Sequence, residues 1–223
     1  MSNQVIDWLE SQQDNMLDLL GELVNIDSNS FDKAGVDRVA KRLAEFFDAQ
    51  SIPHETIPIT THGDAMRAVV AGGNGNRPIL LCGHRDTVFP TGEVVKRPFR
   101  IENGRAYGPG VADMKPGLVI NAFILAAFQK FGGHPNPLVG LFTGDEEIGS
   151  PTSQDVIIAE AKKHALRLTA SPGDQMETLL QSAKVAYSAI AKSRVLQRIQ
   201  ADFLKMVAVQ SKSWLVKYSL CTH

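Results

Sequence analysis

The stretch Leu138–Glu147 reads LVGLFTGDEE and changes abruptly from apolar to acidic. Its first six residues, Leu138–Thr143, form a short and almost continuously apolar run, which is typical of a central strand covered on both faces. Three acids follow at the carboxyl end, where ligands gather in open α/β sheets. The stretch therefore predicts a buried strand that leads directly into a polar site.

Apolar segments on either side extend the α/β pattern. Residues 117–131 are apolar nearly all round, which predicts a buried helix packed on a sheet. Asn103-Gly104 between two short extended runs is a hairpin signal. The other elements that we expect are strands at 68–71 and 79–82, and helices at 5–24, 36–47 and 151–163. Together they predict an α/β domain.

Two further patches, Gly83–Thr87 (GHRDT) and Gly108–Lys115 (GPGVADMK), carry a histidine and more acids. One follows a predicted strand and the other leads into the buried helix, so both can reach the same edge of the sheet. His84 offers an imidazole, a common zinc ligand. Asp86 lies on the same side of an extended segment and could hydrogen-bond the other ring nitrogen. Asp113 can bridge two cations through its two oxygens.

Glu146 and Glu147 complete this set of side chains. Adjacent residues cannot easily both bind from one side, which permits a division of labour between a base and a metal ligand. Taken alone, a histidine at a strand end or a pair of acids is more often a solvated surface feature. The three patches together favour a hydrolytic zinc site over that interpretation.

The segment from Gly83 to Ser150 resembles the co-catalytic zinc exopeptidase family, which includes glutamate carboxypeptidase, acetylornithine deacetylase and succinyl-diaminopimelate desuccinylase. The likeness is strongest to glutamate carboxypeptidase and covers residues 15–164. Ordered motifs carry it: Gly-His-x-Asp-Thr-Val at 83–88, Pro-Phe-Arg at 98–100, Ala-Tyr-Gly-Pro-Gly at 106–110, Asp113, and Asp-Glu-Glu-x-Gly-Ser at 145–150.

The resemblance implies a three-layer catalytic domain, with a mixed sheet and helices on both of its faces. It implies that His84 binds one zinc ion, that Asp113 bridges two ions, and that Glu147 binds the other. Glu146 would then be the general base, and Asp86 would orient His84. An intact site of this family holds two Zn²⁺, with Co²⁺ or Mn²⁺ as alternatives. The peptide bond after the bridging aspartate is commonly cis.

The same resemblance implies hydrolysis of an amide or peptide bond next to a carboxylate, in a small peptide or an N-acyl amino acid. Family members form homodimers through a lid domain. Three other interpretations stay open: deacetylase or desuccinylase activity, a catalytically inactive remnant of such an enzyme, and an interaction module. Zinc titration combined with a hydrolysis assay separates the enzyme from the remnant.

The chain departs from the family pattern after residue 164. Where the family has a further acidic ligand, usually within Glu-Pro-Gly, this chain reads Ser171-Pro172-Gly173, and a later histidine ligand is missing. Residues 165–223 hold eight Lys/Arg against three Asp/Glu, although the whole chain holds 23 and 24. We therefore expect residues 1–164 to be the N-terminal part of a zinc peptidase domain. Residues 165–223 would be a poorly ordered tail without the lid and dimerisation domain.

A frameshift near His164 would explain this break and leave a truncated chain. Met176 has a single codon, which limits the possible gene sequence. With permitted codons elsewhere, the neighbouring frame over Ala170–Glu177 can read Glu-Pro-Gly-Arg-Pro-Asp-Gly, which looks like a continuation of the family. The hypothesis accounts for the altered charge and the missing acid together.

Composition indicates a cytoplasmic globular protein. The net charge of -1 favours neither nucleic acid nor an anionic membrane as a partner. Cys82 and Cys221 form no disulfide framework, which favours a reducing compartment. The first residues do not read as a signal peptide, and no apolar stretch approaches the ~18 residues that a spanning helix needs.

Overall fold

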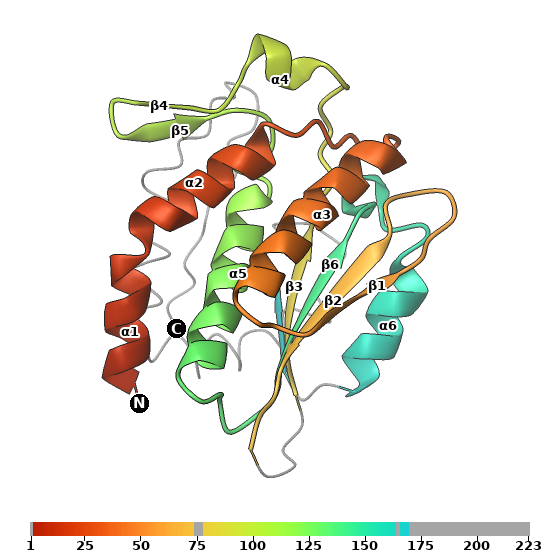
Figure 1. The fold of residues 1–223 in the computed structure, drawn as a ribbon. Coiled ribbons are helices and arrows are strands. Elements are labelled where there is room, and N and C mark those ends of the chain that lie inside the picture. Colours follow the sequence, from red (N-terminus) through yellow and green to blue (C-terminus); the bar gives the residue numbers. More distant parts are fainter. Residues whose placement is uncertain (1, 74–77, 164–165, 170–223) are drawn as a thin grey trace, which may run out of the picture.

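The computed structural model describes residues 2–73, 78–163 and 166–169 (Figure 1). At its centre is a mixed sheet with the strand order β1-β2-β6-β3-β7. Its strands are β1 (His54–Ile57), β2 (Ala65–Val70), β3 (Ile79–His84), β6 (Leu138–Thr143) and β7 (Leu166–Thr169). β3 runs parallel to β6 and β7, whereas β2 runs antiparallel to both β1 and β6.

Helices cover both faces of the sheet and make three layers (Figure 1). One face carries α1 (Ser2–Ser11), α2 (Gln13–Val24), α3 (Lys33–Ala49) and α5 (Lys115–Lys130), and the other carries α6 (Gln154–Lys163). Alternate residues of β3 divide between these faces: Leu81 packs in the larger core, and Leu80 packs in the smaller core beside α6. The predicted α/β architecture with helices on both faces is confirmed.

The α5 helix lies between the sheet and the N-terminal helices, as its all-round apolar sequence predicts. It begins with Pro116 in its first turn, where the missing backbone N–H costs no hydrogen bond. Leu118, Ala122 and Leu125 are fully buried, and Phe123 contacts Trp8 of α1 with ring centroids 6.2 Å apart. This packing holds the amino end of α5 at one edge of the sheet.

The N-terminal segment differs from the expected single helix. It forms two helices that meet at Gln12, whose backbone N–H bonds to Leu9 O over 3.1 Å in a tighter turn. The break lets α1 lay Val5 and Leu9 against the common core while α2 follows a different direction (Figure 1). Periodic apolar residues continue across this break, so the pattern alone does not reveal it.

A hairpin and a short helix lie beyond the amino end of α5, beside α2 (Figure 1). The hairpin consists of β4 (Arg100–Glu102) and β5 (Arg105–Tyr107), and it follows α4 (Glu93–Lys96). Asn103 and Gly104 have φ values of 51° and 71°, as the two-residue turn requires, so the Asn-Gly prediction is confirmed.

The strand register brings the two motif-bearing strand ends together. His84, the last residue of β3, is paired with Thr143, the last residue of β6. The segment between these strands returns through α5, whose amino end lies at the same edge of the sheet (Figure 1). Three distant motifs therefore lie beside one another.

The β7 strand begins just beyond the expected boundary at residue 164 and pairs in parallel with β3. The rest of the predicted tail, 170–223, lies outside the described residues, as do residues 74–77. Within the parts of the chain that are described, none of the helices is both long and apolar enough to cross a membrane.

Candidate metal centre

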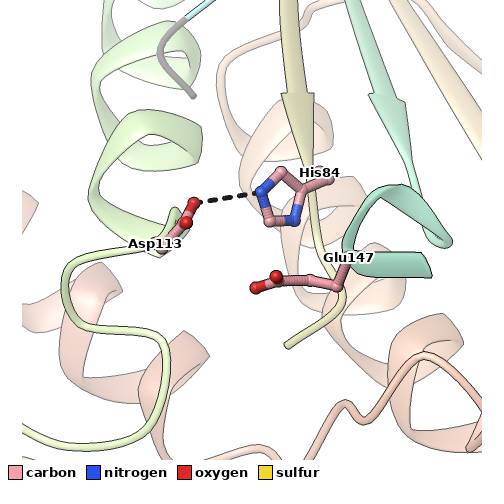
Figure 2. Close-up of side chains that lie close together, drawn as sticks. All are labelled: His84, Asp113 and Glu147. Atoms are coloured by element: carbon pink, nitrogen blue, oxygen red, sulfur yellow. Dashed lines mark hydrogen bonds and ion pairs between the residues drawn. The ribbon is translucent and has the colours of Figure 1, made fainter. Parts of the chain in front are cut away.

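The candidate ligands come from three elements and face a common point (Figure 2). His84 ends β3, Asp113 precedes α5 by two residues, and Glu147 lies in the 3-10 turn η1 (Glu146–Ile148) after β6. The Asp113–Met114 peptide bond is cis, as the resemblance implies. Figure 2 shows the Asp113 carboxylate directed at the His84 ring, with the Glu147 side chain extending below that ring.

Short distances join these groups. His84 Nε2 lies 3.1 Å from Asp113 Oδ1 and 3.5 Å from Glu146 Oε2. One potential ligand atom each from His84, Asp113 and Glu147 lies within 4.8 Å of the other two. The histidine is buried, while the three carboxylates are half-buried and can be reached from solvent. The structure thus places one imidazole and three acids around a single small space.

Crowding of acids around a buried imidazole shifts the pKa values of the group. Burial disfavours the charged form of His84, but hydrogen bonds to Asp113 and Asp86 outweigh it and raise its pKa to about 10. Burial raises the pKa of Glu147 to about 7, helped by the nearby carboxylates and opposed by His84. The pKa of Glu146 is raised for the same reasons. A divalent cation among these groups would favour neutral imidazole and charged carboxylates.

Asp86 faces the other nitrogen of the histidine ring. His84 Nδ1 lies 3.1 Å from the Asp86 backbone oxygen and 3.3 Å from Asp86 Oδ1. Asp86 is fully buried, and burial alone would raise the pKa of its carboxyl. Contacts with His84, Ser30 and the Glu147 backbone N–H outweigh burial, so the pKa of Asp86 is lowered. Asp86 therefore remains an acceptor beside Nδ1 and leaves Nε2 directed at the other acids.

Asp145, the first acid of the Asp-Glu-Glu run, is fully buried, and its hydrogen bonds go to the segment before α6. Its buried carboxylate accepts hydrogen bonds from the backbone N–H and hydroxyl groups of Thr152 and Ser153, just before α6. The Ser150 N–H also bonds to the Asp145 backbone oxygen over 2.8 Å. These bonds close the turn that carries Glu146 and Glu147. The motif contains Asp145, but nothing in its spacing indicated this role.

Lys115 is a second residue whose part in the site had no sequence signal. Its buried ammonium donates to Leu23 O in the last turn of α2 and to Ile26 O just after this helix, at 2.9 and 2.8 Å. Burial lowers the pKa of Lys115 to about 7, against the opposing charge of Asp27. Gly110 packs so closely against Lys115 and Thr87 that any side chain at position 110 would collide with them. The loop that carries Asp113 is therefore fastened to α2.

The donor set fits zinc in chemistry and in size. Zinc binds imidazole nitrogen and carboxylate oxygen at about 2.0–2.2 Å, so two donors on one ion are at most about 4.4 Å apart. The 3.1 Å between His84 Nε2 and Asp113 Oδ1 suits a shared ion. Glu147, within 4.8 Å, suits the same ion after a small movement, or a second ion about 3.5–4 Å from the first.

Comparisons with known proteins identify the family of the chain. The family model described as peptidase family M20/M25/M40 matches residues 80–204, which is more than half of the chain. The chain belongs to this family. The match includes His84, Asp113, Glu146 and Glu147, and it runs past residue 164 into the segment for which the sequence predicts a tail. That boundary stays a prediction.

Two named relatives are similar to the chain in sequence, and a solved structure is similar to it in fold. Carboxypeptidase G2 of Pseudomonas sp. (strain RS-16) is 31% identical over 188 residues, covering 79% of this chain and 43% of the relative. Acetylornithine deacetylase of Proteus mirabilis (strain HI4320) is 31% identical over 160 residues, covering 59% and 40%. The crystal structure of human carnosine dipeptidase 1 shares the fold, with a TM-score of 0.66 and 16% identity, covering 77% and 41%. The chain thus spans less than half the length of these relatives.

Proposed function

We propose that the chain binds zinc through His84, Asp113 and Glu147 and, with Glu146 as general base, hydrolyses an amide bond next to a carboxylate. The observation that carries this proposal is the convergence of the three ligand atoms within 4.8 Å, with Glu146 Oε2 3.5 Å from His84 Nε2. His84 and Asp113 would hold one ion, and Asp113 and Glu147 would hold a second. Co²⁺ or Mn²⁺ could replace Zn²⁺ at such donors.

Each protein group has a distinct task in this proposal. The chemistry that bound divalent ions supply is polarisation of the scissile carbonyl and acidification of the attacking water. Glu146 takes the proton from that water and delivers it to the leaving amine. Asp86 keeps the His84 ring turned so that Nε2 faces the acids. The turn closed by Asp145 holds Glu146 beside the ligands.

Similarity to the carboxypeptidase supports a small peptide or an N-acyl amino acid as the substrate. Similarity to acetylornithine deacetylase favours an acyl amino acid as the alternative, with desuccinylation as a related activity. We place the protein in the cytoplasm, since two cysteines in 223 residues are too few for the disulfide framework of a small secreted protein. Hydrolysis rates for acyl-glutamate and acetylated or succinylated amino acids separate these substrates.

An inactive remnant is the competing interpretation, because Ser171 stands where the family has an acidic ligand. This position lies outside the described residues. With only two protein donors for each ion, binding would be weak, since zinc sites normally have at least three protein ligands. Negligible zinc binding together with no turnover would support the remnant.

Two substitutions of adjacent glutamates test the proposal. Glu146→Gln removes the base and should abolish hydrolysis while zinc binding, measured by elemental analysis, is retained. Glu147→Gln removes a ligand and should lower the zinc content itself. Unchanged hydrolysis by Glu146→Gln, or equal loss of zinc from both variants, would contradict the assigned roles.

A further inference from the structure

The Asp86 carboxylate contacts four groups that belong to three different parts of the chain. Oδ2 accepts a hydrogen bond from Ser30 Oγ over 2.7 Å and one from the Glu147 N–H over 3.1 Å. Oδ1 accepts from the Glu146 N–H over 3.2 Å and lies 3.3 Å from His84 Nδ1. One buried carboxylate therefore joins the histidine ring to the backbone of the glutamate turn.

Ser30 reaches this carboxylate from the loop between α2 and α3. That loop runs beside the residues after β3, with Asn29 and Thr87 paired in a parallel bridge. The Thr87 N–H bonds to Ser28 O over 2.8 Å, and Asn29 Nδ2 donates to Phe89 O over 3.1 Å. These bonds hold the backbone of the Ser30 loop beside Asp86. The loop should therefore keep its position when the Ser30 hydroxyl is removed.

The Ser30 hydrogen bond controls how the Asp86 carboxylate is turned. An ionised carboxylate offers about four acceptor positions, and the four contacts occupy them. The contact with Ser30 is the shortest of the four, as expected for a charge-assisted O–H···O bond. Without it, the Glu147 N–H is the one hydrogen-bond donor that Oδ2 keeps among the described residues, and the carboxylate is free to rotate towards it. Rotation would move Oδ1 away from His84 Nδ1 and from the Glu146 N–H together.

We propose that Ser30 is a positioning residue: through Asp86 it holds the His84 ring and the Glu146–Glu147 turn in one fixed arrangement. The effect on metal binding rests on the proposed function, whereas the effect on the turn does not. Among the described residues, the hydrogen bond of the Ser30 hydroxyl goes to Asp86 and not to a candidate metal ligand, so Ser30 acts through this carboxylate. Its loss should therefore loosen both sides of the centre at once.

Ser28 offers a matched control two residues away. Both serines are buried, with 1% of Ser28 and 2% of Ser30 exposed, and within the described residues the Ser28 hydroxyl has no hydrogen-bond partner. Ser30→Ala should weaken zinc binding about tenfold or more, the loss typical when a group supporting a metal ligand is removed. Ser28→Ala should leave zinc affinity unchanged, and Ser30→Thr, which keeps the hydroxyl, should restore most of it. Competition with a chromophoric chelator measures each affinity.

Amide hydrogen exchange provides a readout that needs no metal. Ser30→Ala should speed exchange at the N–H groups of Glu146 and Glu147, relative to Ser28→Ala, since both amides donate to Asp86. In an Asp86→Asn background, adding Ser30→Ala should cause little further change, because the shared acceptor is already altered. Thermal unfolding of each variant identifies any general loss of structure.

The outcomes separate the two proposals. If the unaltered protein binds no zinc, the proposed function fails, and the exchange experiment still decides the role of Ser30. If the unaltered protein binds zinc but Ser30→Ala and Ser28→Ala behave alike in both affinity and exchange, the positioning role is wrong. Additive effects of Ser30→Ala and Asp86→Asn would also overturn it.

Discussion

Replacing Asp145 with alanine tests whether the turn that carries Glu146 and Glu147 depends on the hydrogen bonds of the buried Asp145 carboxylate. The Asp145 carboxylate is fully buried and accepts four hydrogen bonds from Thr152 and Ser153. Two of the donors are backbone N–H groups at the amino end of α6, where the helix dipole also favours a negative charge. Asp145→Ala would leave these donors without their buried acceptor.

The size of the effect follows from these contacts. Hydrogen bonds to a charged group contribute about 1.5–3 kcal/mol each, but bonds that share one acceptor do not add in full. Removing Asp145 also relieves some repulsion with Glu146, whose pKa it helps to raise. We expect a net loss of about 3–5 kcal/mol in the free energy of unfolding, as for other broken buried networks. That is a large part of the ~5–15 kcal/mol of a typical domain.

Urea unfolding followed by circular dichroism measures this loss, with Asp155→Ala as the control. Asp155 is an exposed acid in the first turn of the same helix, so its removal should cost only about 0.3–1 kcal/mol. Asp145→Ala should also weaken zinc binding, since Glu147 loses its support. A loss for Asp145→Ala no larger than that of the control would refute the reasoning.

Three further outcomes can be checked. Burial alone would raise the pKa of Glu160, but hydrogen bonding to Lys163 and the charge of Arg67 outweigh it, so the pKa is lower in the folded protein than in the unfolded chain. The charged Glu160 carboxylate stabilises the fold fully at pH values above its unfolded pKa, near 4.5, and this stabilisation is lost as the pH falls through its lower folded pKa. Glu160→Gln should therefore flatten the acid side of a curve of unfolding free energy against pH, measured by urea unfolding. Adding zinc at about 100 times its dissociation constant should raise the free energy of unfolding by about 2.7 kcal/mol, and a chelator should reverse this; an unchanged unfolding midpoint would contradict the metal site. The gene downstream of the codon for His164 should contain codons that allow the Glu-Pro-Gly frame, and incompatible codons would end the frameshift hypothesis.

Local sequence patterns were sufficient where an element is defined by its own apolar residues. The α5 helix and the β6 strand are buried along almost their whole length, so their sequences contain the signal. The β1 strand was missed because His54–Ile57 has no apolar alternation and its residues are exposed or half-buried. It is a strand because β2 lies beside it and pairs with its backbone. The division of the N-terminal helices at Gln12 likewise depends on the packing of α1 against α5.

The residue types at the candidate centre were legible in the sequence, because an imidazole and several acids recur in three patches at the ends of predicted elements, and together these patches favour a cation site. Their distances were not, since the pairing of His84 with Thr143 depends on the register of two strands far apart in the chain. Tertiary structure alone also revealed Ser30 and the carboxylate of Asp145 as supports. A serine in a loop carries no recognisable motif, and a buried carboxylate meets its donors only after distant segments have packed. The sequence states which residue types are present, whereas the hydrogen bonds that compensate a buried carboxylate form only in the folded chain.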